Sequence, residues 1–362
     1  MDKLPRGGKA AGNPLSGDAG ESAQEQAPPG VSPAASQGED KPIRLGVSAC
    51  LLGRPVRFDG GHKHDRWITG ELGRYVEFVP VCPEVEAGFG VPRESMRLVG
   101  DPEAPRLMTT KTGRDLTPVM TAWAQKRADE LAAEDLCGFI FKSKSPSSGM
   151  TRVKVYSEKG GMAVHKGVGL FAKAFMERFP LLPVEEEGRL LDARLRENFI
   201  ERIFVLRSWR ETARACAKPG GCTMAAISGF HARHKLLIVA HSPEHARAMG
   251  RLVAHAKDAE SPQLHAGYEK LLLEALGRLA TVPRTVNVLQ HICGYFRKLI
   301  TLDERQELAE VVEDYRRGLI PLIVPVTLIN HHVRVQGVEY LAGQVFLKPH
   351  PLELKLRNYF SF

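Results

Sequence analysis

Three apolar runs decide the fold of the first half of this chain: IRLGVSAC at residues 43–50, EFVPVC at 77–82 and LCGFIFKSKS at 136–145. Each run has the length and composition of a buried strand, and each ends in a polar loop. In an open α/β sheet, the loops at the carboxyl ends of neighbouring strands converge on one crevice. The sequence therefore predicts a single site built from the loops that follow these three strands.

Segments with helical spacing alternate with these runs. We expect helices at about residues 68–74, 118–133 and 169–179, and a further strand over RVKVYS at 152–157. Strands that alternate with helices favour a mostly parallel sheet covered by helices. The first half is thus predicted to be an α/β domain.

Beyond Asp192 nearly every segment has the spacing of an amphipathic helix. The expected helices lie at residues 193–215, 224–240, 243–279, 285–300, 303–317 and 320–334. This pattern predicts an all-α C-terminal domain. We therefore divide the chain into an arm at 1–41, an α/β domain at 42–187 and a helical domain at 188–362.

Composition sets the broad class of the protein. The arm is mostly Gly, Pro, Ala and Ser, with too few large apolar side chains to offset the entropy of ordering, so we predict that it is disordered. The whole chain has 362 residues, 43% of them hydrophobic, which is enough to bury a core in each of two domains. The longest apolar stretch, residues 319–329, is too short to span a bilayer and is expected in the core.

The net charge of +8 and the six cysteines bear on partners and compartment. The excess of Lys and Arg favours an anionic partner such as nucleic acid, although a merely soluble basic surface would have the same composition. Cysteines in a long chain without a recognisable secretory signal favour reduced thiols or metal ligands over disulfides. We therefore expect a cytoplasmic protein.

Two carboxylates near the predicted crevice are candidate catalytic groups. Glu84 follows Cys82 by two residues and should project into the same crevice, where a partly desolvated carboxyl suits activation of water or proton transfer. Its alternative role is to accept hydrogen bonds from backbone amides of the neighbouring loop. Asp59, in RFDGG, either orients a substrate or stabilises a tight turn before Gly60 and Gly61.

The loop SPSSGM at residues 145–150 carries hydroxyls and backbone donors, and basic residues such as Lys144 flank it. Such a loop suits a phosphate or a nucleotide base, but it is no P-loop because GxxxxGK is absent. Arg93 is a second candidate for anion binding, with a solvated arginine as the alternative. His231 and His234, at i and i+3 in FHARHK, could face one metal ion, but they lack an evident third ligand.

The motifs SACLLGRPVRFDGGHK at 48–63, VPVCPEVEAGFGVPRE at 79–94 and FKSKSPSSGM at 141–150 resemble the bacterial thiouracil desulfidase family and the wider domain-of-unknown-function family 523. The resemblance covers about residues 43–185. The second half, with FHARHKLLIVAHSPE, NVLQHICGYFRK and YLAGQVFLKPHPLELKLRN, resembles the helical YbgA-like domain, domain-of-unknown-function family 1722. The resemblance assigns no activity to that half.

The desulfidase resemblance implies a four-iron four-sulfur cluster held by three cysteines, with an uncoordinated iron that takes the sulfur of a thiocarbonyl substrate. Cys50 and Cys82 match two of the three positions, and Ser148 stands at the third. The resemblance also implies that Glu84 acts as acid/base and that Ser145 is a substrate-side hydroxyl.

The serine at the third cluster position leaves several alternatives open. Serine is a much poorer ligand than thiolate for an iron-sulfur cluster, so Ser148 would make the cluster labile. Another cysteine could replace it, although Cys137 should lie on the order of 26 Å away, at the other end of its strand. Cys50 and Cys82 could also be packed thiols in a site that has lost its cofactor.

Two functions follow from these observations. The leading hypothesis is a desulfidase-like enzyme that removes sulfur from a thiolated nucleobase or related heterocycle with an iron-sulfur cluster. The alternative is a non-catalytic two-domain module that binds nucleic acid or a protein partner. The sequence does not determine the substrate, the role of the helical domain or the oligomeric state.

Overall fold

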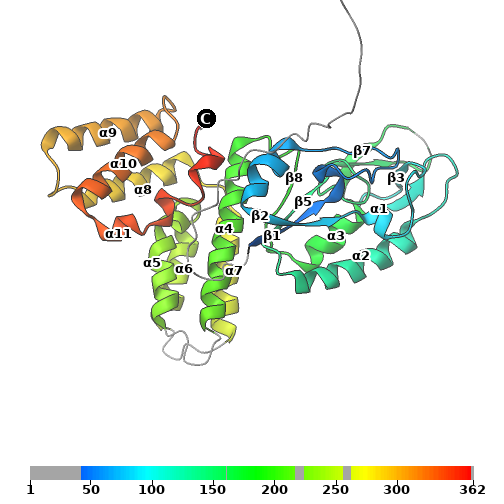
Figure 1. The fold of residues 1–362 in the computed structure, drawn as a ribbon, viewed down its shortest axis with the longest axis horizontal. Helices are drawn as coiled ribbons and strands as arrows, with labels where there is room; N and C mark the ends of the chain where they lie inside the picture. Colours follow the sequence, from blue (N-terminus) through cyan, green and yellow to red (C-terminus); the bar gives the residue numbers. More distant parts are fainter. Residues whose placement is uncertain (1–41, 160, 217–223, 256–261, 360–362) are drawn as a thin grey trace, which may run out of the picture. The chain divides into compact units, whose positions relative to one another are not determined.

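A computed structural model describes residues 42–159, 161–216, 224–255 and 262–359 (Figure 1). The predicted disordered arm over residues 1–41 lies outside these ranges. The described residues form an α/β part followed by a mostly helical part, which confirms the predicted fold class.

The first sheet has four parallel strands in the order β2-β1-β5-β8. They are β1 (Ile43–Ser48), β2 (Val76–Val81), β5 (Gly138–Phe141) and β8 (Val184–Glu186). β1 lies between the other two predicted strands, and its last residue, Ser48, pairs with Val81, the last residue of β2. The three runs identified in the sequence are therefore neighbours, and their carboxyl ends share one edge of the sheet.

Two helices pack together beside this sheet, α2 (Thr117–Leu131) and α3 (Leu170–Arg178). Their apolar sides join an aromatic cluster in which Phe139 and Phe141 of β5 contact Phe171 of α3, with ring centroids 5.7 and 6.1 Å away. Gly46 in the middle of β1 makes room for this cluster, because a Cβ there would lie 2.2 Å from the Phe139 ring. The apolar faces of these helices and of β5, which the sequence periodicity predicted, thus pack into one core.

A second four-stranded sheet, in the order β4-β3-β6-β7, was not predicted as a separate unit. Its strands are β3 (Met96–Val99), β4 (Arg106–Thr109), β6 (Val153–Tyr156) and β7 (Val164–Gly167). β6 is the strand expected at RVKVYS, but it pairs with β3 and β7 rather than with the first sheet. The reason is a separate small core, in which Leu98 and Leu107 pack with Val155 and Met120.

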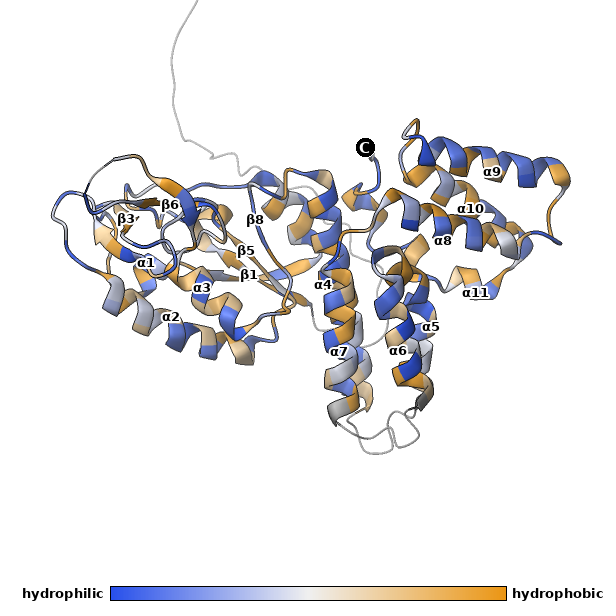
Figure 2. Ribbon diagram, turned by 180° about the vertical axis from the view of Figure 1, so that it is seen from behind, coloured by the Kyte–Doolittle hydropathy of each residue, from blue (hydrophilic) through white to orange (hydrophobic). Residues whose placement is uncertain are grey.

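Helices make up most of the second part: α4 (Ala193–Cys216), α5 (Met224–His241), α6 (Pro243–His255), α7 (Pro262–Leu276), α8 (Val282–Tyr295), α9 (Leu302–Arg316), α10 (Ile323–Gln336) and α11 (Glu339–Ala342). Several of these helices carry hydrophobic residues on one side and hydrophilic residues on the other (Figure 2). Their buried faces share one cluster with the first sheet.

Helix α4 also packs directly on that sheet. A Cβ added at Gly138 of β5 would lie 3.0 Å from Cγ2 of Ile203 and 2.8 Å from the carbonyl oxygen of Pro183, so glycine permits the close approach. Arg210 of α4 donates a hydrogen bond to the carbonyl oxygen of Leu136 at 2.7 Å. The domain boundary at residues 187/188 remains a prediction.

Among the described residues, no helix combines the length and the apolar character that crossing a membrane requires.

Candidate functional site

A cavity of about 350 Å³ opens at the carboxyl ends of β1, β2 and β5. Its lining includes all but one of the residues predicted for the site, namely Cys50, Cys82, Glu84, Arg93, Lys144, Ser145 and Ser148. These side chains come from three loops that are far apart in sequence. They meet because parallel strands place their carboxyl ends at one edge of the sheet.

Cys50 lies in a 3₁₀ turn, Ala49–Leu52 (η1), directly after β1. The turn ends at Gly53, whose φ of +85° is a left-handed conformation that favours glycine. Ser48 Oγ accepts a hydrogen bond from the Lys142 backbone amide at 2.9 Å, which ties the end of β1 to the end of β5. Cys50 therefore lies between the end of β1, which is hydrogen-bonded to the end of β5, and a turn that ends at Gly53.

Cys82 precedes the short helix α1 (Pro83–Glu86), whose first residue is a proline with φ suited to a helix start. The carboxylate of Glu86 accepts a hydrogen bond from the Cys82 amide at 2.8 Å. The Cys82 thiol donates to Oε2 of Glu84 at 3.5 Å. This turn presents a thiol and a carboxyl group to the same cavity.

Arg93 also contacts the Glu84 carboxylate and orients it. Its Nη2 atom lies 3.7 Å from Glu84 Oε2, and the two side chains are only 8% and 14% exposed. Nη1 of Arg93 donates to the carbonyl oxygens of Val56 and Gly90 at 3.0 and 2.9 Å. The guanidinium is therefore held in place, and it is not the freely solvated arginine that the sequence left open.

Ser147 is the residue in this site that sequence reasoning missed. Its hydroxyl is fully buried and donates to Oε1 of Glu84 at 2.5 Å. The Ser145 and Ser147 hydroxyl oxygens are 3.0 Å apart, so two hydroxyls join the cavity to the Glu84 carboxyl. The sequence signal was present in SPSSGM, but a run of serines does not show which hydroxyl turns inward.

The loop that carries these serines is packed tightly against the start of α3. The carbonyl oxygen of Ser147 accepts hydrogen bonds from the amides of Phe171 and Ala172 at 2.9 and 3.2 Å. A Cβ at Gly169 would lie 2.5 Å from the Ser147 carbonyl group, and one at Gly149 would lie 2.4 Å from Val153. Gly169 thus allows the loop to lie against the start of α3, and Gly149 allows it to lie against β6.

Two glutamates at the end of β8 also hold the loop, a role that no pattern in the sequence indicated. Glu186 Oε1 accepts a hydrogen bond from the Met150 amide at 2.7 Å. Glu187 accepts from the amide and the hydroxyl of Ser143, each at 2.7 Å, and pairs with Lys142. These contacts make β8 part of the site's support.

Burial sets the protonation of the two thiols. Burial, with a smaller contribution from the charge of Glu84, raises the pKa of Cys50 to about 11 and that of Cys82 to about 12. Both residues are therefore neutral thiols at neutral pH in the metal-free protein. Binding of a metal centre here would have to release their protons.

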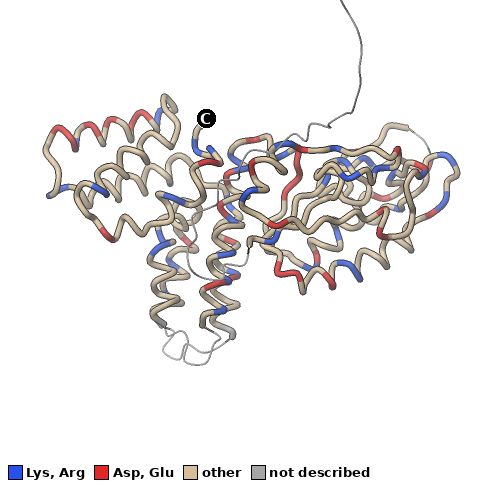
Figure 3. The backbone as a smooth tube through the Cα atoms, viewed as in Figure 1, with Lys and Arg blue, Asp and Glu red and all other residues tan. Residues whose placement is uncertain are grey.

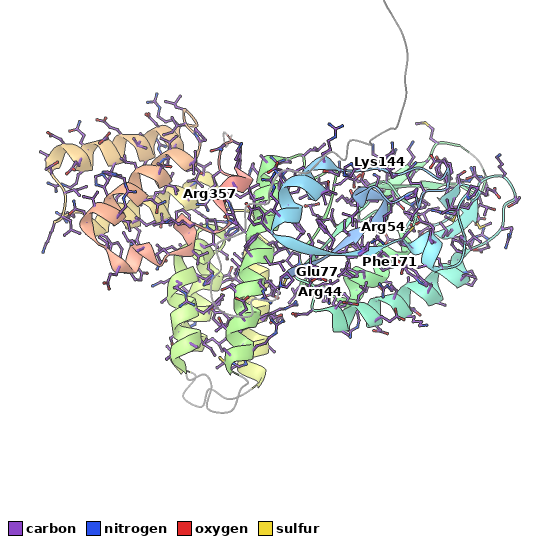
Figure 4. All side chains as sticks on the ribbon, viewed as in Figure 1. Arg44, Arg54, Glu77, Lys144, Phe171 and Arg357 are labelled. Carbon is purple, nitrogen blue, oxygen red and sulfur yellow. The ribbon has the colours of Figure 1, made fainter. Side chains whose placement is uncertain are left out.

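The cavity lining carries an excess of positive charge. Its basic residues are Arg57, Lys63, Arg93, Lys142 and Lys144, against a single carboxylate, Glu84. One of these basic residues, Lys144 (Figure 4), has a left-handed backbone conformation, with a φ of 60°. Elsewhere basic and acidic residues are both spread along the described chain, with acidic residues gathered on α9 (Figure 3). The excess at the cavity suits an electron-rich or anionic ligand.

Asp59 is the predicted site residue that does not line the cavity. Its Oδ1 atom accepts a hydrogen bond from the Gly61 amide at 3.0 Å and lies 3.6 Å from Nε of Arg57. The hydrogen bond lowers the pKa of Asp59. This geometry matches the turn role that the sequence offered as one of two alternatives.

The donors around the cavity differ from the three thiolates that the desulfidase resemblance implies. Cys50 and Cys82 provide two thiols, and the third position is a buried hydroxyl, Ser148, which is 3% exposed. A neutral hydroxyl with a high pKa is a poor ligand for iron in a sulfide cluster. The residues present thus do not fit a cluster with three thiolate ligands.

No other cysteine of the described part of the chain lines the cavity. The Cys137 amide bonds to the Arg44 carbonyl near the start of β1, at the opposite end of the sheet. Cys216 ends α4, and Cys293 lies on α8. Cys222 lies outside the described residues.

The comparisons with known proteins divide the chain into two matched regions. Residues 45–187 match the family model described as 2-thiouracil desulfurase, and residues 235–351 match that of a protein of unknown function, DUF1722. The uncharacterized protein YbgA of Escherichia coli (strain K12) is 31% identical over 166 residues, covering 46% of this chain and 95% of that protein. The uncharacterized protein YbbK of Bacillus subtilis (strain 168) is 31% identical over 108 residues, covering 28% of this chain and 71% of that protein.

Among solved structures, the 4Fe-4S-dependent thiouracil desulfidase TudS aligns with 29% identity over 41% of this chain and 93% of that chain, with a TM-score of 0.33. The region that matches the 2-thiouracil desulfurase family includes every residue that lines the cavity.

Proposed function

We propose that the cavity of this chain, which belongs to the family of the uncharacterized protein YbgA, removes sulfur from a thiolated nucleobase or related heterocycle. The support is the match of residues 45–187, which include the cavity lining, to the 2-thiouracil desulfurase family. One observation carries the proposal. The Ser145 hydroxyl, the Ser147 hydroxyl and the Glu84 carboxyl form a continuous hydrogen-bonded chain beside the thiols of Cys50 and Cys82.

The net reaction exchanges a carbon–sulfur bond for a carbon–oxygen bond without oxidation or reduction. A thiocarbonyl and water give a carbonyl and hydrogen sulfide, so the oxygen and both protons come from water. Glu84 takes a proton from the attacking water, and Ser147 and Ser145 pass a proton toward the departing sulfur. Arg93 holds the Glu84 carboxyl in the orientation that this transfer needs.

The cluster belongs to the proposal only as a cofactor to be tested, because Ser148 stands where a third thiolate is implied. We would reconstitute the protein anaerobically with iron and sulfide and measure iron per chain beside Ser148→Cys and Cys50→Ala. About four irons per chain in the wild type would establish a cluster despite the serine. Iron bound only by Ser148→Cys would show that the cluster is lost here.

The activity itself is tested by sulfide release from 2-thiouracil after that reconstitution. We expect Glu84→Gln to lower the rate by roughly 10² to 10⁴, the usual contribution of a general acid or base. The matched control is Glu77→Gln, which changes a carboxyl on β2 whose side chain is 52% exposed. If neither the reconstituted wild type nor Ser148→Cys releases sulfide, the result favours the alternative function, a non-catalytic module.

A further inference from the structure

A buried charged cluster lies in the helical part, away from the cavity described above. Glu197 and Glu201 are one turn apart on α4, and Arg357 from the C-terminal segment bridges them (Figure 4). Arg357 Nε lies 2.9 Å from Oε1 of Glu197, and Nη2 lies 3.0 Å from Oε1 of Glu201. All three side chains are at most 8% exposed.

The remaining carboxylate oxygens also have neighbours. The Tyr359 hydroxyl donates to Oε2 of Glu197 at 2.6 Å. His241 Nε2 lies 3.2 Å from Oε2 of Glu201, and its Nδ1 lies 2.6 Å from the Arg278 carbonyl oxygen. Both ring nitrogens of His241 thus face oxygen acceptors.

His350 supplies an independent observation that points to a ligand. It is 8% exposed, and its Nδ1 lies 3.2 Å from the Pro351 carbonyl oxygen, which places the ring proton on Nδ1. Nε2 is then a bare lone pair, and it is buried without a hydrogen-bond partner. Histidines that bind metals commonly donate one ring N–H to a carbonyl and use the other nitrogen as ligand.

The three side chains converge closely enough for one ion. A ring nitrogen of His350 and one carboxylate oxygen each of Glu197 and Glu201 all lie within 4.8 Å of one another. A cavity of about 50 Å³ beside the two glutamates, lined also by His241 and Arg357, exceeds the volume of a single water molecule. We propose that Glu197, Glu201 and His350 bind a divalent transition-metal ion, for which Zn²⁺ is the best match.

The donor set supports this choice of ion. Imidazole favours transition metals over Mg²⁺ and Ca²⁺, and two carboxylates with one imidazole suit Zn²⁺. Three protein ligands leave a fourth position to water, as in zinc sites that carry out chemistry. Arg357 occupies one lone pair on each glutamate, and each carboxylate oxygen has a second, so the guanidinium and the ion can share the pair.

The test measures binding of Zn²⁺ alone by the full chain. Cys50→Ala/Cys82→Ala serves as the parent, because cysteine sulfur is itself a common zinc ligand and the substitutions remove the two thiols of the other site. We would determine zinc per chain after dialysis, and the affinity by competition with a chromogenic chelator. The key variant is His350→Gln, which removes the imidazole at similar size, and its control is His331→Ala, an exposed histidine on α10.

The proposal expects about one zinc per parent chain and an affinity lower by on the order of tenfold or more in His350→Gln, with no change in His331→Ala. Should His350→Gln fail to fold, as judged by circular dichroism, Glu201→Gln replaces it, and zinc should raise the Tm of the parent. A parent that binds no zinc, or variants that bind it as tightly as the parent, would overturn the proposal and leave the cluster as a closed ion-pair network.

Discussion

Ser147 donates its hydroxyl proton to Oε1 of Glu84 across a separation of 63 residues in the chain. The two residues meet because β2 and β5 lie on either side of β1 in one parallel sheet. The contact links the Glu84 carboxyl to the Ser145 hydroxyl, and both residues line the cavity. It is the contact on which the proposed proton transfer depends.

Replacing Ser147 by alanine tests this link. The variant leaves Glu84 without its hydroxyl donor, so we expect the free energy of unfolding to fall by about 1–3 kcal/mol. If Ser147 also passes a proton, the rate of sulfide release should fall by roughly tenfold or more. Urea unfolding and steady-state assays measure the two effects. The control Ser157→Ala, at an exposed turn, should change neither the stability nor the rate. A fully active Ser147→Ala would show that Ser147 does not pass a proton.

The raised pKa values of Cys50 and Cys82 predict a dependence of stability on pH. The native state holds these thiol protons more tightly than the unfolded chain, so their stabilising contribution is complete below pH 9, the ordinary value for a cysteine. It is lost as the pH rises from 9 through about 11 and 12. Urea unfolding at increasing pH should show a steeper loss in the wild type than in Cys50→Ala/Cys82→Ala.

The same shifts predict slow alkylation of both thiols by iodoacetamide at pH 8, measured site by site with mass spectrometry. Only the thiolate reacts, and burial and Glu84 both disfavour it. Glu84→Gln should therefore speed labelling of Cys50 and Cys82, whereas Glu77→Gln should not. Labelling as fast as in the urea-unfolded chain would contradict the predicted shifts.

Arg357 is expected to be essential for the stability of the helical part. Arg357→Met leaves two buried glutamates without their guanidinium, a change that typically costs about 3–5 kcal/mol. Chemical unfolding monitored by circular dichroism gives the loss. Arg316→Met breaks an exposed pair with Glu313 and should leave the free energy of unfolding nearly unchanged, because solvent screens exposed ion pairs. Equal effects of the two substitutions would show that the buried network adds no stability.

Gly46 is expected to tolerate no side chain. In Gly46→Ala the new Cβ meets the Phe139 ring at 2.2 Å, so the aromatic cluster must shift at a cost of about 1–3 kcal/mol. Gly70→Ala is the matched control, because nothing lies within 4 Å of the position that its new methyl group would take. Thermal unfolding compares the two, and an unchanged Tm for Gly46→Ala would mean that this core is loosely packed.

Local patterns were enough to predict much of the α/β part. Apolar runs ending in Cys50, Cys82 and the SPSSGM loop were expected on neighbouring parallel strands, and the sheet order confirms that arrangement. The second sheet was not foreseen, because its strands are only four residues long and alternate weakly. Short strands are selected by long-range pairing more than by their own sequence.

The sequence by itself determined the two structural classes, the three strand ends that form the cavity and the serine at residue 148. These depend on the local period of apolar residues and on residue identity. Only the tertiary structure decided that Ser147 turns toward Glu84, and that Glu197, Arg357 and His350 meet in one cluster. Glu197 and Arg357 are 160 residues apart, and no local pattern encodes such a contact. Buried polar groups gain their partners only when distant elements pack, because packing alone excludes the water that would otherwise solvate them.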